Sequence, residues 1–288
     1  ATDRRVVRDL ISGADVVIEN YRKGALERHG LHPASMLAEH PRLLWCTITG
    51  FGAESARPGY DFVVQAESGW MAITGEPGRS PMKVGVALVD VIAGKDAAIS
   101  ILAALAGGRR GHAADRRLVV SLQQSAVGAL VNVAQNALVT GRDAERWGNA
   151  HANLVPYELF PASDRGIVIA VGNDAQFAAL ERVLETGVLA NPRFFTNAGR
   201  VAHRGEVVGA IRARLAHGSA AEWVTRLGDA GVPCGVVRSV LEAVGDVSSS
   251  ELTGVAPLPP SAVRRAPPTL DEHGALVRAH RWDAFGRA

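Results

Sequence analysis

The first part of the chain alternates between helical hydrophobic patterns and short apolar runs. Thr2 to Ser12 spaces its apolar residues along one face of a helix, and residues 15–19 (DVVIE) follow as a short buried strand. A helix is expected at 34–39, between two prolines, and a strand at 43–49. Residues 118–121 (LVVS) indicate another strand. This alternation predicts an α/β fold with an open, mostly parallel sheet.

One carboxylate stands where two hydrophobic patterns meet. Residues 83–105 begin with alternating apolar positions, typical of a strand, and show helical spacing from Gly94 onward. Asp90 is therefore predicted at a strand-to-helix turn. A carboxylate there can cap the helix and lies in the positive field of its N-terminus, so a structural role is one interpretation of Asp90.

The later part of the chain predicts a second, smaller α/β domain. We expect a long helix at 122–139, buried on most of its surface, to precede it. Within it we expect a strand at 166–171, helices at 174–184, 201–216 and 220–230, and a strand at 234–237. Asn173 is a good cap for the first of these helices, and Ser219 with Glu222 has the capping-box pattern. The expected domains are 1–145, to which 250–288 return, and 146–249.

Composition narrows the class of protein. The 288 residues are 47% hydrophobic and carry a formal net charge of +2, which indicates no nucleic-acid groove but suits a phosphate-bearing ligand. Cys46 and Cys234 stand apart in apolar contexts and are interpreted as buried free thiols of a reducing cytosol. We expect no metal site. No apolar run is long enough to span a bilayer and the first residues have no signal-peptide pattern, so we expect a cytoplasmic protein.

Four motifs around the Asp90 stretch point to a family. They are ADVVIENYRKGALERHGL (14–31), PRLLWCTITGFG (41–52), RPGYDFVVQAESGWMAITGEP (57–77) and GNAHANLVPYELFP (148–161). In this order they resemble the class III CoA-transferases, which include formyl-CoA, carnitine and succinyl-CoA:dicarboxylate transferases. The resemblance implies a Rossmann-like CoA-binding domain, coenzyme A as substrate or product, no tightly bound cofactor, and a homodimer of two interlocked chains.

The resemblance also assigns Asp90 a chemical role, because the matching family residue is the nucleophile. A carboxylate that attacks an acyl-CoA makes a mixed anhydride and frees the CoA thiolate, which can return to leave an enzyme thioester. We expect backbone N–H groups at the turn to lie near the resulting oxyanion. Gly85 and Gly94 flank Asp90 and either help there or serve chain turning.

The expected CoA pocket lies after the strand at 15–19. Asn20 and Tyr21 follow the carboxyl end of that strand, where open α/β sheets bind ligands, and the resemblance places them in the pocket. Arg28 matches a family arginine that meets the adenine and phosphate end of CoA, and its forked donors suit phosphate. The alternative for Arg28 is a solvated charge at a helix end.

Tyr60 separates two reactions. The related acyl-CoA racemases carry His at this position beside their Asp, whereas tyrosine titrates near 10 and is a poor base at neutral pH. Racemization is therefore disfavoured, and Tyr60 is assigned to the CoA pocket. The alternative is a buried ring with a satisfied hydroxyl. Asp61 is either a second acid near the site or a loop carboxylate.

Two residues of the second domain are candidates for the acyl or acceptor site. Asn149 and His151 lie in a stretch that resembles the succinyl-CoA:dicarboxylate members. The alternative for a lone loop histidine is a structural or exposed position.

The chain also departs from the family pattern. It opens where family members have a long preceding section, so we expect the first strands of the family fold to be missing, and the section between the equivalents of Asp246 and Pro257 is shortened. We expect a CoA-transferase that moves CoA from an acyl-CoA, with succinyl-CoA as a candidate donor, to a carboxylic acid. The alternatives are an acyl-CoA racemase and a non-catalytic CoA-binding scaffold.

Overall fold

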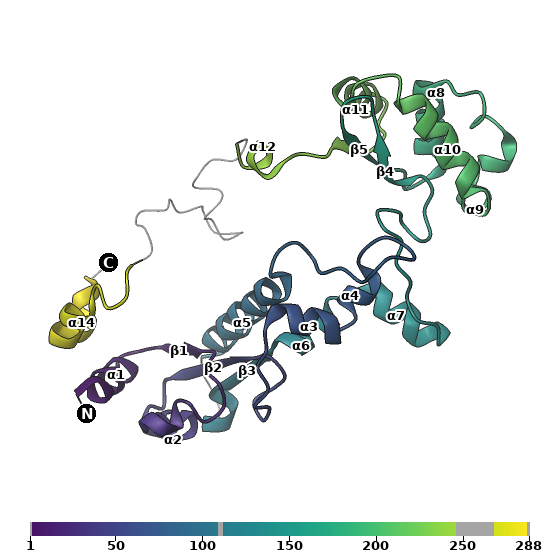
Figure 1. Cartoon of the computed structure of the whole chain (residues 1–288). Helices are drawn as coiled ribbons and strands as arrows, with labels where there is room; N and C mark the ends of the chain where they lie inside the picture. The colour runs from purple at the N-terminus through teal and green to yellow at the C-terminus, as the bar shows by residue number, and fades with distance from the viewer. Residues whose placement is uncertain (1, 109–111, 246–267, 287–288) are drawn as a thin grey trace. The chain divides into compact units, whose positions relative to one another are not determined.

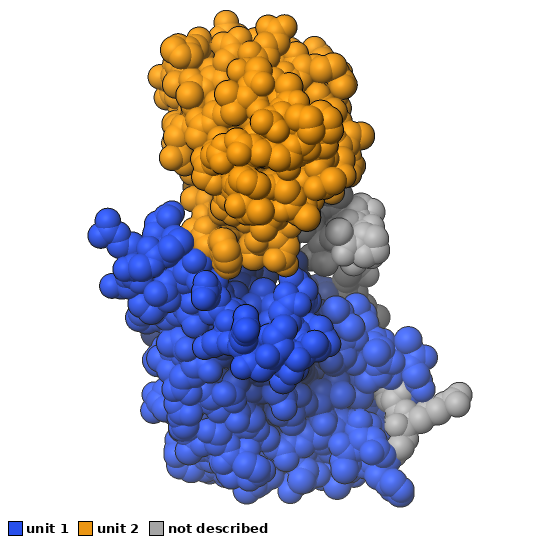
Figure 2. Space-filling model, turned by 90° about the vertical axis from the view of Figure 1, so that its right-hand side faces the viewer, with its two compact units in different colours: residues 1–146, 267–288 blue, residues 147–266 orange. Residues whose placement is uncertain are grey.

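The fold consists of two compact units. A computed structural model describes residues 2–108, 112–245 and 268–286 (Figure 1). Unit 1 comprises Ala1–Arg146 and Pro267–Ala288, and unit 2 comprises Trp147–Ala266 (Figure 2). Of the segment 250–288 that is expected to return to the first domain, residues 250–267 lie outside the described residues. The result is a mixed α/β structure with one sheet in each unit.

Unit 1 is built on a parallel sheet, as the alternation predicts. Its strands are β1 (Val16–Glu19), β2 (Leu44–Thr49) and β3 (Arg117–Ser121), in the order β1-β2-β3. Glu19 pairs with Thr47, and Thr47 pairs with Val119. Because paired residues of parallel strands point to the same side, these three side chains share one face of the sheet.

The helices of unit 1 cover the two faces of this sheet with separate cores. One core joins Cys46 and Val120 to buried residues of α5, and the other packs Trp45 against α1 and α2. The helices are α1 (Thr2–Ser12), α2 (Pro33–Glu39), α3 (Asp61–Glu67), α4 (Trp70–Ile73), α5 (Leu88–Ala106), α6 (Leu122–Gly128) and α7 (Val131–Thr140), with 3-10 turns η1 (Glu27–His29) and η2 (Ala113–Arg116).

The prediction of one long buried helix at 122–139 is wrong. The segment forms α6 and α7, and Val131, at the start of α7, has a φ of 40°, which no α-helix interior allows. Leu138 and Val139 are 83% and 73% exposed. Apolar composition all round the helix indicated burial, but only α6 packs against the core around α5.

The last described segment packs on the first helix of the chain. It forms α14 (Gly274–His280) and the 3-10 turn η4 (Arg281–Phe285), which lie beside α1 (Figure 1). The Trp282 indole donates to the Leu10 carbonyl over 2.9 Å, and Arg281 pairs with Asp9 at 3.0 Å. These contacts join two ends of the described chain within unit 1.

Unit 2 has an antiparallel sheet of β4 (Tyr157–Pro161), β5 (Gly166–Ala170) and β6 (Cys234–Val236), in that order. The strand β4 was not expected from the sequence. The helices are α8 (Asp174–Leu184), α9 (Asn197–Ala202), α10 (Arg204–Leu215), α11 (Ala220–Asp229) and α12 (Val240–Gly245), with the turn η3 (Pro192–Phe194). The single helix expected at 201–216 is thus wrong, because His203 interrupts it between α9 and α10.

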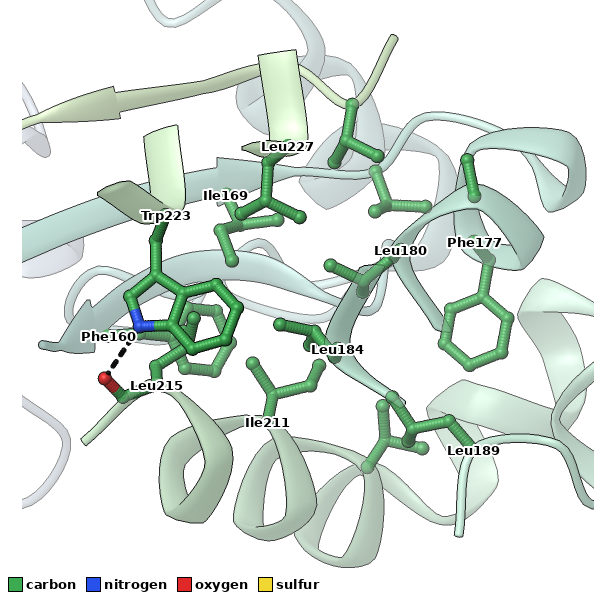
Figure 3. Packing of buried hydrophobic residues seen from close by; sticks show 14 of the residues in the cluster. Phe160, Ile169, Phe177, Leu180, Leu184, Leu189, Ile211, Leu215, Trp223 and Leu227 are labelled. Carbon is green, nitrogen blue, oxygen red and sulfur yellow. Dashed lines mark hydrogen bonds between the residues drawn. The ribbon is translucent and has the colours of Figure 1, made fainter. Parts of the chain in front are cut away.

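The core of unit 2 is continuous and apolar. Side chains from α8, α10 and α11 pack over β4 and β5, and the indole of Trp223 donates to the Leu215 carbonyl over 3.0 Å (Figure 3). The caps are as predicted: Asn173 accepts from the Gln176 amide, and Ser219 with Glu222 forms a capping box. Each large apolar side chain buried here contributes roughly 1.5–3 kcal/mol.

Candidate active site

A cavity of about 380 Å³ lies in unit 1 at the carboxyl ends of β1 and β2. Four of the predicted site residues line it together: Asn20, Tyr21, Tyr60 and Asp90. They come from three separate parts of the sequence. The sheet edge therefore gathers them where open parallel sheets bind ligands.

The end of β1 sets the position of the first two residues. The carboxylate of Glu19, the last residue of the strand, accepts the Tyr21 amide at 2.9 Å. This short turn directs the chain away from the sheet. The Tyr21 ring is 62% exposed at the cavity, so its face is available for stacking.

The floor of the cavity holds an unpartnered hydroxyl. Thr47 of β2 lines the cavity and is buried, and its Oγ1 has no hydrogen-bond partner within the described residues. A buried polar group without a partner is costly. A bound molecule with a polar group at this point would satisfy it.

A tight loop closes the other side of the cavity. Residues 50–59 leave β2 and return so closely that a Cβ on Gly59 would lie 2.1 Å from the Gly50 Cα. The Gly50 carbonyl also accepts the Gln123 amide at 3.0 Å, which ties the loop to α6. Only glycines permit this backbone contact, and it places Tyr60 at the cavity.

We expect Gly59→Ala to destabilise unit 1 by about 1–3 kcal/mol, because two backbone segments must separate. Gly94→Ala is the matched control: nothing lies within 4 Å of its added Cβ, and it removes a glycine from a helix. It should stabilise by about 0.8–1.0 kcal/mol. Denaturant unfolding measures both. If the two substitutions change the free energy of unfolding equally, the close contact with Gly50 is not the reason for glycine at position 59.

Tyr60 is exposed, and the interpretation of a buried ring is wrong. Its side chain is 68% exposed and lines the cavity. The residues after it form α3 and α4, and Phe62 of α3 is also 58% exposed. Tyr60 therefore has the position expected of a ligand contact.

Asp90 lies in the first turn of a helix, and not at a strand-to-helix turn. No strand covers 84–88 and α5 begins at Leu88, so the expected strand is wrong. The capping interpretation of Asp90 is wrong as well. The N–H groups of Val89 and Asp90 donate to Asp61 Oδ1 at 2.8 and 3.2 Å. Asp61 therefore caps α5, and it also lines the cavity beside Asp90, so of its two interpretations the second acid near the site is the one that the structure supports.

This occupied cap corrects the expected oxyanion site. The two N–H groups that begin α5 already have an acceptor, and Gly94 lies inside the helix, where its N–H belongs to the helical ladder. The N–H groups of Val89 and Asp90 are thus not free for a reacting oxygen.

The surroundings of Asp90 raise the pKa of its carboxyl. Desolvation at the cavity wall is the larger cause, and the negative charge of Asp61 is the second. The carboxylate has no hydrogen-bond partner within the described part of the chain. It is an unpaired carboxylate at a cavity, the state that a nucleophile requires.

Basic side chains line the same cavity. They are Arg22, Lys23, Arg57 and Arg117. Lys23 pairs with Glu54 at 2.6 Å and lowers the pKa of that carboxyl, and the Arg57 guanidinium lies 4.0 Å from the centre of the Phe51 ring. Four carboxylates also line the cavity, those of Glu19, Glu27, Asp61 and Asp90, so it is the guanidinium and ammonium donors, and not a net positive charge, that suit a ligand with phosphates.

Arg28 is not among the residues that line the cavity. It lies in η1 and is exposed, and the left-handed Gly30 (φ 73°) ends that turn. Arg22 and Lys23 thus line the cavity, whereas Arg28 does not.

The candidates Asn149 and His151 belong to unit 2. Arg204 donates to the carbonyls of His151 and Ala152 at 2.8 and 3.0 Å, which fixes this loop. The His151 Nδ1 accepts the Asn153 amide at 3.0 Å. In the neutral ring the proton is then on Nε2, so the imidazole presents a donor. Asn149 is exposed.

Sequence reasoning missed Gln65 and underrated Asp61. Gln65 is fully buried and donates to Asp61 Oδ2 at 2.6 Å, and its Oε1 accepts the Val84 amide at 2.9 Å. The one available signal was a polar residue four positions after Asp61 in an apolar segment, a spacing that joins side chains on a helix. Across residues 2–108, 112–245 and 268–286, no group of three or more His, Cys, Asp or Glu side chains could hold a metal ion.

Comparison with known proteins identifies the family. The profile described as CoA-transferase family III matches residues 1–279. The chain belongs to CoA-transferase family III. It is 40% identical to succinate–glutarate CoA-transferase of Agrobacterium fabrum over 84% of this chain and 61% of that protein. It is 35% identical to succinyl-CoA:glutarate CoA-transferase of Mus musculus, over 84% of this chain and 56% of that protein. The chain thus spans little more than half the length of these curated relatives.

A solved structure of the family has the same fold. A CaiB/BaiF family protein from Brucella suis superposes with a TM-score of 0.80 at 35% identity, over 96% of this chain and 78% of that one. None of the described helices has both the length and the apolar character to cross a membrane.

Proposed function

We propose that this protein moves CoA from an acyl-CoA to a carboxylic acid through an aspartyl-CoA thioester on Asp90. The observation that carries the proposal is the unpaired carboxylate of Asp90 in the same cavity as Asn20, Tyr21 and Tyr60. Membership of a CoA-transferase family supports the reaction class.

The reaction requires only exchanges between carboxylates and one thiolate. Asp90 attacks the thioester carbonyl, forms a mixed anhydride and releases the CoA thiolate. The thiolate attacks the Asp90 carbonyl, forms the enzyme thioester and releases the donor acid. The acceptor carboxylate then attacks this thioester, frees the thiolate again and forms a second anhydride. Attack of the thiolate on the acceptor carbonyl gives the new acyl-CoA and restores Asp90.

The residues around the cavity are assigned roles in binding CoA. Asn20, Tyr21 and Tyr60 contact it, and the basic side chains of the cavity meet its phosphates. Arg28 remains our candidate for the adenine and phosphate end, outside the cavity wall. Asn149 and His151 are proposed for the acyl or acceptor group, where the Nε2 donor of His151 suits a carboxylate.

We propose a dicarboxylic acid as acceptor and succinyl-CoA as donor. The bacterial and the mouse relative are both named for succinate or succinyl-CoA and glutarate. A panel of carboxylic acids offered with succinyl-CoA tests this preference. Exchange with monocarboxylates as fast as with dicarboxylates would contradict it.

Trapping of the intermediate tests the reaction itself. The purified chain is incubated with succinyl-CoA and then with hydroxylamine, which converts an aspartyl thioester or anhydride to a hydroxamate. Peptide mass spectrometry should find the hydroxamate at Asp90 and at no other carboxylate. CoA binding without modification of Asp90 would support the non-catalytic scaffold and reject the transferase.

The exposed Tyr60 distinguishes transfer from racemization. We expect Tyr60→Phe, which keeps the ring and removes the hydroxyl, to cost at most one hydrogen bond, about 0.5–1.5 kcal/mol in kcat/KM. Tyr60→His should create no appreciable α-proton exchange, because a general base also needs an aligned substrate. Deuterium uptake into a 2-methylacyl-CoA measures this. Uptake by the unmodified chain that is faster than acyl transfer would favour the racemase.

The remaining expectations concern the whole protein. We propose a Rossmann-like arrangement of the CoA-binding unit, a homodimer of interlocked chains and a cytoplasmic location. The support is the family resemblance, and segments 140–156 and 247–268 are the candidate connectors between the domains, the second mostly outside the described residues.

A further inference from the structure

The start of α5 is capped from another helix. Its N-cap residue is Ala87, whose side chain has no acceptor, so the first N–H groups of the helix need a partner from elsewhere. Asp61 of α3, 28 residues before Val89 in the sequence, supplies it through Oδ1. A cap from such a distance fixes the position of the helix start relative to α3.

Gln65 completes this connection on both sides. It donates to the second oxygen of Asp61 at 2.6 Å and accepts the amide of Val84, in the segment that leads into α5, at 2.9 Å. We name Asp61 and Gln65 the α3 clamp. Both oxygens of Asp61 are thereby engaged, and the buried Gln65 has little freedom to move.

The clamp has a consequence for Asp90, which is the third residue of α5. A carboxylate at this position is attracted to the N–H groups of its own helix end, which carry partial positive charge. Here Asp61 accepts from the N–H groups of Val89 and Asp90. The Asp90 carboxylate is left without a partner among the described residues and lines the cavity.

We infer that Asp61 is a positioning residue for the reaction, which keeps the Asp90 carboxylate unpaired at the cavity by occupying the helix N–H groups in its place. This inference rests on the proposed function of Asp90. Asp61 also acts through its charge, because its own carboxylate lies close to the carboxylate of Asp90.

The elements packed against α5 carry few other titratable groups. On α3 there is also Glu67, which pairs with Arg57, and β2 carries the buried Cys46. Arg117 lies on β3, and α6 has no titratable residue. On α5 itself Lys95 and Asp96 follow Asp90 by more than one turn. Asp61 is the charge that acts on the pKa of Asp90.

Two substitutions separate the cap from the charge. Asp61→Asn keeps an acceptor for the helix but removes the negative charge, whereas Asp61→Ala removes both. We expect Asp61→Ala to slow formation of the Asp90 hydroxamate by roughly 10-fold to 100-fold, because the helix start shifts and Asp90 turns to the vacated N–H groups. Asp61→Asn should restore most of the rate, and the KM for succinyl-CoA should change little in either variant.

The pH profile gives a readout that a merely structural role would not change. Asp90 must be ionised to attack, so the rate falls as the pH drops through its pKa. That pKa is raised in the unmodified chain, so the acid limb lies above the usual range of an aspartate. Without the charge of Asp61 the limb should move to lower pH in both variants. Asp96→Asn, on the same helix, is the matched control and should leave the limb in place.

NMR decides the inference independently of activity. In Asp61→Ala we expect the amides of Val89 and Asp90 to exchange with solvent roughly tenfold faster or more, and the carboxyl of Asp90 to titrate at lower pH. If the unmodified chain forms the hydroxamate and Asp61→Ala forms it as fast, the inference is overturned and the proposed function stands. If the unmodified chain forms no hydroxamate, the proposed function fails. If, in addition, amide exchange of Val89 and Asp90 and the titration of Asp90 are the same in Asp61→Ala as in the unmodified chain, the positioning role of Asp61 is overturned as well.

Discussion

Replacement of Asp90 by asparagine is expected to abolish CoA transfer. The amide has nearly the shape of the carboxylate, so α5 and the cavity should persist, but it cannot form the anhydride or the thioester. We expect kcat/KM to fall roughly 10⁴-fold or more, as for the loss of other covalent nucleophiles. Affinity for CoA should stay within about threefold, because the side chains that bind it are unchanged. Transfer assays and calorimetric titration with CoA measure these two quantities.

The control for this variant is Asp96→Asn on the same helix. Asp96 accepts from the Ser125 hydroxyl at 2.6 Å and does not line the cavity. Its loss should leave kcat/KM within about threefold. Substantial transfer by the Asp90 variant, or an equal loss in both variants, would show that another group carries the reaction.

Much of the cavity could be predicted from sequence because its residues follow strands or recognisable motifs. Asn20 and Tyr21 come after the short apolar run of β1, and short buried runs between helical patterns identify parallel strands well. Alternation along a strand predicts only which residues of that one strand share a face. The pairing of the strands needed the structure.

The surroundings of Asp90 could not be predicted in the same way. Val84, Val86 and Leu88 alternate as in a strand, yet the segment leads into a helix and its Val84 amide bonds to the Gln65 side chain. The cap of α5 comes from Asp61, far away in the sequence. Local patterns carry no signal for such contacts, so tertiary interactions decided both the helix start and the partner of its N–H groups.

The burial of two arginines also could not be predicted from the sequence. Arg116 donates to the carbonyls of Leu37, His40 and Leu43 in unit 1. Arg200 has the corresponding role in unit 2. Arginine usually lies on the surface, and these two are buried because backbone carbonyls from separate segments converge on them.

Arg200→Leu is expected to destabilise unit 2 strongly. The side chain is 1% exposed, lies over the Phe177 ring, and donates to the carbonyls of Val155, Phe194 and Phe195 at 2.6, 2.9 and 3.2 Å. Leucine fills part of the volume but offers no donor. Each buried carbonyl left without one costs about 1–3 kcal/mol, so we expect a loss of about 3 kcal/mol or more.

Hydrogen exchange on the whole chain should localise this effect. Peptides from α8 and β5 are expected to exchange faster in the Arg200 variant, while peptides from the sheet of unit 1 serve as the internal reference, because Arg200 and its partners all lie in unit 2. Arg182→Leu is the matched control. That arginine is exposed on α8, and its replacement should change stability by no more than about 0.5 kcal/mol. If unit 2 is equally protected from hydrogen exchange in Arg200→Leu and Arg182→Leu, the backbone carbonyls that converge on Arg200 are satisfied without it. Arg200 would then contribute packing alone.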